Sequence, residues 1–543
     1  MTMLLEIGRV AWIGSILALA IFVPVVVVRR RHASVADLVA QLATTSLAAI
    51  VIITALSRLT LLNPVTLAAA FCCWPIAKWV TRHRRSIGRD GRAAAWSMML
   101  AAVRWWESGD RRAAAIRYGH AAAAEFALAW HNCIRSAHLT AFLAVAAVIL
   151  VAPRMVPALL NTRLGGTAAY GELIVAQQMV TGETASLMPQ PFAAMSAALS
   201  MASSIGVVHV LRWLPPIMSF LTILVLIVLV SRSSGSIGAA VIAAATMTWL
   251  SAPMHEPSTT LANLFLVLAL FAWRERLAGG AIGAPAAIAA TVVAALAAPY
   301  AALFICVAVG CLLVTQQGLA LAVTGVAWLL LSWLQGADGP GAVAVPLATS
   351  LIVGGIVQKL VAGFPCDTRP RRLAAGLATA VCVFAAGVPR SSGIQYVEYD
   401  AAARKSLDIA TTFPRYRFMV VGPVEQWALT YGRGWHMNLY EFVERVGAAL
   451  ERPVYQLPFN VDDVFVFVET QPFATFAREP RHVPFAVLND PVFRHYRSLP
   501  GRSSLQFAAL DVCERLRQIA PAEIYYQDDQ LRIYRFMRAA DGD

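Results

Sequence analysis

Residues 164 to 191 read LGGTAAYGELIVAQQMVTGETASLMPQP and lie between two long apolar segments of the chain. Their mixture of glycines, prolines and polar residues does not suit a membrane span. A short helix-like run from Leu173 to Gln177 ends at Gly182, and Pro189 and Pro191 then lead into the small-residue run AAMSAALSMASSIG. The stretch therefore predicts an external loop with two short helices separated by a proline-bearing turn.

The chain as a whole is far more apolar than a soluble domain. Of its 543 residues, 58% are hydrophobic and 14% are charged, and the mean hydropathy is +0.63. Apolar stretches of span length recur, so we expect a mostly α-helical, polytopic transmembrane bundle of about twelve spans. The expected spans cover residues 10–28, 43–61, 63–80, 137–153, 212–231, 236–251, 258–273, 284–298, 299–315, 317–334, 341–357 and 373–389.

Lysine and arginine are distributed unevenly between the connections of these spans. If the Arg29–Arg31 run is cytoplasmic, 21 Lys and Arg residues fall on that side and five on the other before the C-terminal tail. Because positive residues favour cytoplasmic loops, the N-terminus, the 154–211 loop, the 254–257 turn and the chain after residue 389 should lie outside the cytoplasm. The net charge of +13 then reflects topology, and we expect a lipid bilayer and no nucleic acid as partner.

An Ala-rich insert, residues 81–136, falls on the cytoplasmic side and has strong helix propensity. Two helical runs in it join at Ser108–Asp110, which predicts a helical hairpin. One interpretation places this hairpin on the membrane surface, with side chains such as Arg104 and Trp105 facing lipid. The other makes it a docking site for a cytoplasmic partner.

The tail, residues 390–543, is rich in aromatic residues and in both signs of charge, and its length suits one soluble α/β domain. The patterns predict strands at 417–421, 464–468, 523–526 and 531–535, and helices at 401–413, 438–449 and 504–519. We expect Asn438 to cap the second of these helices. Asp528 and Asp529 are expected to form a hairpin turn rather than a metal site.

A glycine-containing run, Gly432–Asn438, precedes that capped helix and carries Trp435 and His436. One interpretation is a loop that presents both side chains to a substrate, since binding residues are common on loops. The other is a structural turn with Trp435 in the core of the domain.

The chain has eight cysteines, and Cys513 is the only one expected in the external regions. A single external cysteine cannot form an intrachain disulfide. No pair of cysteines has the spacing of a zinc site with histidine, so no structural metal site is predicted.

The 164–191 loop resembles the first large external loop of the GT-C superfamily of polytopic membrane glycosyltransferases, which take sugars from polyprenyl-phosphate carriers. The shared order is glycine, acid, aromatic or histidine, short helix, glycine, proline-bearing turn, small-residue helix and arginine. Tyr170, Glu172 and Arg212 are the matching aromatic, acidic and basic residues of this chain. The resemblance implies a polyprenyl-phosphate-linked sugar as substrate and a role for Tyr170 in binding it.

Glycosyl transfer needs a carboxylate that accepts the acceptor's proton and cations that stabilise the departing phosphate. Glu172, and Glu256 beside His255 in the second external loop, are the candidate catalytic residues, with His255 as a substrate contact. Arg212 and Arg390 lie at span ends and are the candidates for paired contacts with phosphate. Each acid would otherwise be a solvated loop carboxylate, and each arginine an interfacial side chain that reaches water. A divalent metal ion could assist by neutralising the phosphate.

We therefore expect four parts: N-terminal transmembrane helices (1–80), a cytoplasmic hairpin (81–136), a GT-C-like transmembrane core (137–389) and an extracytoplasmic α/β domain (390–543). The expected function is sugar transfer from a polyprenyl-phosphate carrier to an acceptor, outside the cytoplasmic membrane. Thr167 and Ala168 stand where the family usually has Asp. The alternative is therefore a catalytically silent relative that serves as a scaffold or carrier-binding subunit in cell-envelope polysaccharide assembly.

Overall fold

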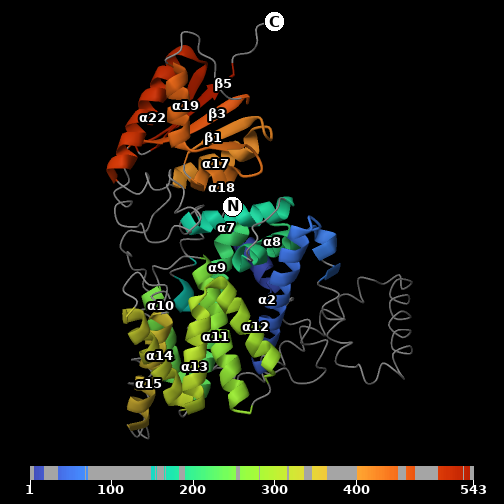
Figure 1. The fold of residues 1–543 in the computed structure, drawn as a ribbon, viewed down its shortest axis with the longest axis vertical. Coiled ribbons are helices and arrows are strands. Elements are labelled where there is room, and N and C mark those ends of the chain that lie inside the picture. The colour runs from blue at the N-terminus through green and yellow to red at the C-terminus, as the bar shows by residue number, and fades with distance from the viewer. Residues whose placement is uncertain are drawn as a thin grey trace, which may run out of the picture.

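The computed structural model describes residues 5–17, 35–67, 69–70, 148–152, 155, 164, 167–182, 190–235, 237–251, 257–279, 282–314, 317–334, 345–363, 400–422, 424–450, 460–470, 499–529 and 531–538. The expected cytoplasmic insert and the expected span at 373–389 lie outside these residues, as do most of the expected spans at 10–28, 63–80 and 137–153. The protein is mostly helical and ends in a mixed five-stranded sheet (Figure 1).

Apolar helices form a bundle in the lower part of Figure 1. They are α2 (Val35–Arg58), α9 (Val207–Ser234), α10 (Ile237–Ser251), α11 (Pro257–Leu277), α12 (Ala284–Ala297), α13 (Tyr300–Val314), α14 (Gln317–Leu334) and α15 (Val345–Gly363). An N-terminal helix covers residues 5–17. The predicted apolar segments between residues 212 and 357 therefore each form a helix. Ala298 and Pro299 separate α12 from α13, and these two helices pack together as a hairpin.

Two of the described helices are long and apolar enough to cross a membrane. These are Val39–Arg58, with 20 residues, and Val207–Ser234, with 28. Several other apolar helices are shorter, for example Ala284–Ala297 and Tyr300–Leu313. Their lengths fall below the roughly 20 residues of a typical span.

α11 is the central helix of the bundle. Every residue from Leu261 to Ala272 is buried, and the helix packs against α9, α12 and α13. A helix that is apolar on all sides is stable only when other helices or lipid surround it. α14 and α15 approach closely through small residues: a Cβ on Gly325 would lie 2.5 Å from the carbonyl oxygen of Ala348.

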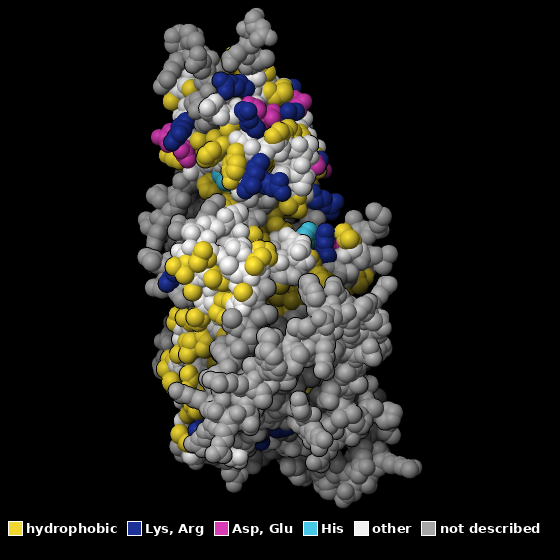
Figure 2. All heavy atoms as spheres, turned by 90° about the vertical axis from the view of Figure 1, so that its right-hand side faces the viewer, with side chains coloured by type: hydrophobic (Ala, Val, Ile, Leu, Met, Phe, Trp, Pro, Cys, Tyr) yellow, Lys and Arg dark blue, Asp and Glu magenta, His cyan; other side chains and the backbone are white. Residues whose placement is uncertain are grey.

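The outward faces of the bundle are apolar. Exposed hydrophobic side chains include Val51, Ile288, Leu296, Leu303, Leu313, Leu330 and Ile356. Figure 2 shows hydrophobic side chains over the described part of the bundle, whereas charged side chains gather over the C-terminal domain. Large exposed apolar surfaces on a soluble protein mark contacts with a partner or a membrane.

Two short helices lie between the bundle and the C-terminal domain, α7 (Thr167–Thr181) and α8 (Pro191–Ser203) (Figure 1). α7 ends before Gly182, whose φ of +79° is a left-handed conformation that glycine adopts without strain. α8 begins with Pro191 at its first turn and is buried along most of its length. The prediction of two short helices in this stretch is confirmed.

The C-terminal domain combines helices with the sheet. Its elements are α17 (Asp400–Thr412), β1 (Phe418–Val421), α18 (Val424–Thr430), β2 (Trp435–Met437), α19 (Leu439–Leu450), β3 (Asp463–Glu469), α22 (Leu499–Ile519), β4 (Ala522–Gln527) and β5 (Leu531–Met537). The strand order is β2-β1-β3-β5-β4. β1 is parallel to β2 and β3, and β5 is antiparallel to β3 and β4.

Alternation along β3 explains how the sheet is covered on both faces. Val464 and Val466 pack with residues of α19 and α22 on one face, and Phe465 and Phe467 pack with residues of α17 on the other. Successive side chains of a strand point to opposite faces, so a strand buried on both sides is apolar at every position. The domain therefore has three layers, with helices on either side of the sheet.

The strands and helices predicted for the tail are confirmed within a few residues. Asn438 caps α19, because its Oδ1 accepts a hydrogen bond from the amide of Glu441 (2.6 Å). Asp528 closes the hairpin turn by accepting a hydrogen bond from the amide of Leu531 (2.9 Å). The prediction of a loop for residues 432–438 is wrong in part, since Trp435–Met437 form strand β2 at the edge of the sheet.

Candidate functional site

A cluster of charged side chains lies at the end of the bundle that faces the C-terminal domain. Glu6 of the N-terminal helix forms ion pairs with Arg9 and with Arg212 of α9. Nε1 of Trp213 donates a hydrogen bond to Oε2 of Glu6 (2.9 Å), and Arg9 donates one to Nδ1 of His209 (3.1 Å). We call Glu6, Arg9, His209 and Arg212 the cationic cluster. Two guanidinium groups share one carboxylate in it, so it keeps a net positive charge.

Burial decides what each member of the cationic cluster can do. The side chain of Arg212 is 6% exposed and that of Glu6 is 11% exposed, whereas that of Arg9 is 28% exposed. Both oxygens of Glu6 accept hydrogen bonds from cationic or N–H donors, which stabilises the ionised form. Glu6 therefore suits a role in positioning the arginines rather than in accepting a proton.

The N-terminus of α9 lies beside this cluster. Gly206 occupies the N-cap position of α9 and supplies no capping side chain. The first amides of a helix lack partners within the helix, and the helix dipole adds partial positive charge there. Together with Arg9 and Arg212, the start of α9 forms a region that favours an anion.

An open groove of about 420 Å³ adjoins the cluster. It is lined by Leu62, Asn63, Pro64, Val180, Ser200, Met201, Ser204, Ile205 and Gly206. A Cβ on Gly206 would lie 3.9 Å from the ring of His209, so the groove reaches the cationic cluster. Serine hydroxyls and the Asn63 amide give it hydrogen-bonding groups.

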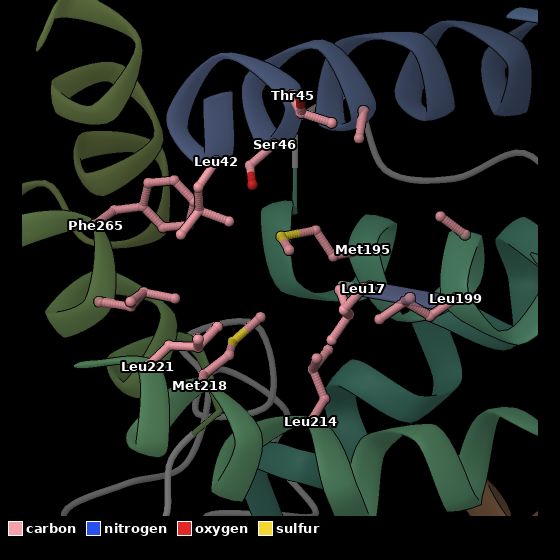
Figure 3. Close-up of a pocket in the computed structure, with 13 residues that line it drawn as sticks. Leu17, Leu42, Thr45, Ser46, Met195, Leu199, Leu214, Met218, Leu221 and Phe265 are labelled. Atoms are coloured by element: carbon pink, nitrogen blue, oxygen red, sulfur yellow. The ribbon is translucent and has the colours of Figure 1, made fainter. Parts of the chain in front are cut away.

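An apolar cavity of about 90 Å³ lies further along α9. Side chains from the N-terminal helix, α2, α8, α9 and α11 converge on it (Figure 3). Leu214, Met218 and Leu221 supply its α9 wall, and Leu214 follows Arg212 by only two residues. The cationic cluster and the cavity therefore share two helices, the N-terminal helix and α9, although Arg212 and Leu214 do not point to the same side of α9.

The structure places the remaining loop candidates on α7. Glu172 is half-buried near the start of the helix, with its Oε2 atom shielded from solvent. Tyr170 is fully buried, and its hydroxyl accepts a hydrogen bond from the amide of Leu164 (3.2 Å). The predicted substrate contact at Tyr170 therefore lies in the packed interior of the loop.

Trp435 and His436 lie on β2 of the C-terminal domain. The Trp435 side chain is exposed, so the interpretation that places it in the domain core is wrong. The His436 ring stacks near Tyr431 (ring centroids 6.0 Å apart) and Trp427 (6.2 Å). Burial lowers the pKa of His436 to about 4, so its ring is neutral at pH 7.

The C-terminal domain contacts α7 close to the groove. Nε2 of Gln178 donates a hydrogen bond to the hydroxyl of Tyr431 (3.1 Å). A Cβ on Gly432 would lie 3.8 Å from the Cγ2 methyl group of Thr181, which follows the groove residue Val180. The Gly432–Asn438 segment therefore begins next to the groove.

Of the other predicted site residues, His255, Glu256 and Arg390 lie outside the described residues. Arg212 is brought to the cationic cluster, where its head group turns inward to Glu6. Sequence reasoning missed Glu6, Arg9 and His209. The spacing of Glu6 and Arg9 by one helical turn at the start of an apolar helix was the available signal, because a charge near a span needs a partner.

Metal binding finds no support in the part of the chain that the structure describes, where no group of three or more His, Cys, Asp and Glu side chains could hold an ion. Comparison with protein families, curated proteins and solved structures gives no match to this chain.

Proposed function

We propose that this protein is a GT-C-like integral membrane glycosyltransferase that uses a polyprenyl-phosphate-linked sugar on the extracytoplasmic face. The observation that carries the proposal is that the cationic cluster and the apolar cavity are built from the same two helices, the N-terminal helix and α9. A polyprenyl phosphate has a matching division between an anionic head and a hydrocarbon tail. Arg9 and the start of α9 would bind the phosphate, and Arg212 would add positive charge from its buried position beside Glu6. The cavity would take the first part of the tail.

The charges at the two ends of α9 support a membrane position for the bundle. Arg232, near the C-terminal end, pairs with Glu275 of α11 (3.1 Å), and Arg274 donates a hydrogen bond to the carbonyl of Arg232 (2.8 Å). Arg212 and Arg232 are 20 residues apart, which is about 30 Å along a helix. This length equals the thickness of the hydrocarbon core of a bilayer. The cluster at Arg212 would then lie at the outer surface and that at Arg232 at the cytoplasmic surface.

The reaction would need little covalent chemistry from the protein. The acceptor hydroxyl would attack the anomeric carbon while the bond from that carbon to the phosphate oxygen breaks. The carrier phosphate would leave with the electron pair, stabilised by Arg9 and Arg212. The hydroxyl proton would pass to a carboxylate, for which Glu172 is our candidate, since Glu6 is held by its ion pairs.

Binding of farnesyl phosphate by the full chain in nanodiscs tests the head-and-tail arrangement. Farnesyl phosphate should bind more tightly than inorganic phosphate or farnesol, since each of these lacks one half of the ligand. Arg9→Ala should weaken its binding about tenfold or more. Arg58→Ala, at an exposed position at the end of α2, is the matched control. Equal binding of farnesol and farnesyl phosphate, or an unaffected Arg9→Ala variant, would refute the proposal.

A substitution in the cavity tests the binding of the hydrocarbon tail separately from the binding of the phosphate. Ala198 lines the cavity, so Ala198→Leu should fill it. This variant should bind farnesyl phosphate more weakly and inorganic phosphate as tightly as before.

Glu172→Gln tests the proposed proton acceptor. It should reduce sugar transfer about 100-fold or more while farnesyl phosphate still binds. Glu444→Gln, on the exposed side of α19, controls for the loss of a surface carboxylate.

A carrier-binding subunit without catalytic activity is the second candidate. The involvement of Glu6 in ion pairs favours it, because this removes one acid from the possible proton acceptors at this end of the bundle. This candidate predicts that farnesyl phosphate binds through Arg9 and the cavity, and that Glu172→Gln leaves the cellular phenotype unchanged.

A further inference from the structure

Two aromatic rings lie side by side on the surface of the C-terminal domain. Trp435 is 54% exposed and Tyr416 is 42% exposed, with ring centroids 5.8 Å apart. Both residues belong to the end of the domain that contacts α7 through Gly432. Large aromatic residues exposed together mark binding surfaces, because their burial by a ligand is favourable.

Hydrogen bonds to backbone carbonyl groups hold the pair in position. Nε1 of Trp435 donates to the carbonyl of Tyr416 (3.2 Å), and the amide of Tyr416 donates to the carbonyl of Arg433 (2.6 Å). Tyr416 has a φ of 60°, a left-handed conformation that is strained for an aromatic residue. Strained residues of this kind persist where the surrounding structure fixes them, and they concentrate at functional sites.

Glycines at two positions allow this arrangement. A Cβ on Gly434 would lie 2.3 Å from Cε2 of the buried Phe418 ring, so only glycine lets the chain approach β1 there. Gly432 has a φ of +72°, which glycine adopts without strain. The rings are therefore presented by a rigid segment, and a ligand would lose little affinity to ordering of the site.

Two arginines border the rings. The guanidinium of Arg415 lies 5.2 Å from the centre of the Tyr416 ring, and its Nε donates to the carbonyl of Gly432 (2.7 Å). Arg415 and Arg433 are exposed, and neither pairs with an acid within the described ranges. The next arginine, Arg417, lies 3.6 Å from Asp462. The surface around the pair is therefore positively charged.

We propose that the Tyr416–Trp435 pair binds an oligosaccharide that carries carboxylate groups. The C–H face of a sugar ring packs on the face of an aromatic ring, and guanidinium groups bind carboxylates through paired hydrogen bonds. The inference rests on the proposed transferase, for which this oligosaccharide is the acceptor. From the aromatic pair, the chain of the acceptor would pass Gly432 and Thr181 into the groove that ends at His209.

Binding to the full chain in nanodiscs tests this surface with two probes of equal length, a tetrameric uronic acid oligosaccharide and a neutral tetrasaccharide. The charged probe should bind more tightly, and added salt should weaken only its binding. Trp435→Ala and Tyr416→Ala should each lower the affinity for both probes about tenfold or more. Arg433→Ala should lower the affinity for the charged probe and leave that for the neutral probe unchanged. The controls are Phe507→Ala on α22, where the side chain is 69% exposed, and Arg445→Ala on α19.

Tyr416→Phe keeps the aromatic ring and should keep the binding. Comparison with Tyr416→Ala then shows whether binding is lost with the ring or through misfolding. The inference is overturned if neither probe binds, if Phe507→Ala weakens binding as much as Trp435→Ala, or if the aromatic pair is a lipid contact. In the last case, amides of 431–437 would exchange more slowly in anionic nanodiscs than in neutral ones. Loss of oligosaccharide binding with unchanged farnesyl phosphate binding would leave the proposed function intact.

Discussion

One ion pair of the bundle and one of the C-terminal domain differ in burial and in the elements that they join. In the bundle, Glu6 and Arg212 are almost completely buried and belong to different helices. In the domain, Glu441 and Arg445 lie one turn apart on α19, and the arginine side chain is 58% exposed. Water solvates the charges of the second pair whether or not the pair forms. The charges of the first pair have lost most of their water, and Arg212 depends on Glu6, and Glu6 on Arg212 and Arg9, to compensate for that loss. The Glu6–Arg212 pair therefore fixes two helices together, whereas the Glu441–Arg445 pair lies on the surface of a single helix.

Arg212→Ala should have the largest effect of the substitutions considered for this comparison. It leaves the buried carboxylate of Glu6 with reduced compensation, which costs about 3 to 5 kcal/mol when one member of a buried pair is removed. Arg445→Ala removes a member of an exposed pair and should cost about 1 kcal/mol or less. Thermal unfolding of the full chain in one detergent compares the two variants.

A double variant shows whether the effect comes from the charge left behind. Glu6→Gln combined with Arg212→Ala should be less destabilising than Arg212→Ala alone, because no buried carboxylate is then left with reduced compensation. If Arg212→Ala and Arg445→Ala lowered the stability equally, the distinction between the two regions would be lost.

The pH dependence of the domain should be controlled by His436. Its pKa of about 4 in the folded domain is below the 6.5 of an unfolded chain, so the unfolded state binds more protons between these values. The stability should therefore fall as the pH decreases from 6.5 to 4, by at most about 3 kcal/mol. Tyr525 and Tyr534, with pKa values raised to about 12 mainly by burial, do not titrate in this window.

Hydrogen exchange of the β1 and β2 amides, corrected for the intrinsic rate at each pH, measures this loss in the full chain. His436→Phe keeps an aromatic ring beside Trp427 and Tyr431 but removes the titration, so the stability of this variant should change less with pH. A pH dependence that survives this substitution would assign the effect to other groups.

Close packing can be tested in both regions by adding one methyl group. Gly325→Ala in the bundle and Gly434→Ala in the domain would each bring a Cβ to less than 3 Å from a neighbouring atom. Overpacking of this kind costs about 1 to 3 kcal/mol. Gly310→Ala on α13 has open space around its Cβ and should be neutral or slightly stabilising. The midpoint temperature of thermal unfolding should therefore be clearly higher for Gly310→Ala than for the other two variants.

The sequence was sufficient for features that depend on local patterns. The apolar helices, the helices α7 and α8, and four of the five strands followed from periodicity and from glycine and proline positions. β2 was missed because it has only three residues and is stabilised by parallel pairing with β1, which no local pattern encodes. The cationic cluster was missed for the same reason, since Glu6 meets Arg212 across more than 200 residues of sequence. Tertiary contacts of this kind are visible only in the folded chain.

The smallest expected effect concerns the way helices begin. Gln190 and Gly206, at the N-caps of α8 and α9, make no side-chain capping bond, whereas Asn438 caps α19. Asn438→Ala should therefore destabilise the domain by about 1 kcal/mol, because the amide of Glu441 loses its partner. Gln190→Ala should change the stability by a few tenths of a kcal/mol at most, since no capping bond is removed. Hydrogen exchange of the first turns of α19 and α8 measures both, and an equal loss of protection would show that the side-chain bond of Asn438 contributes nothing.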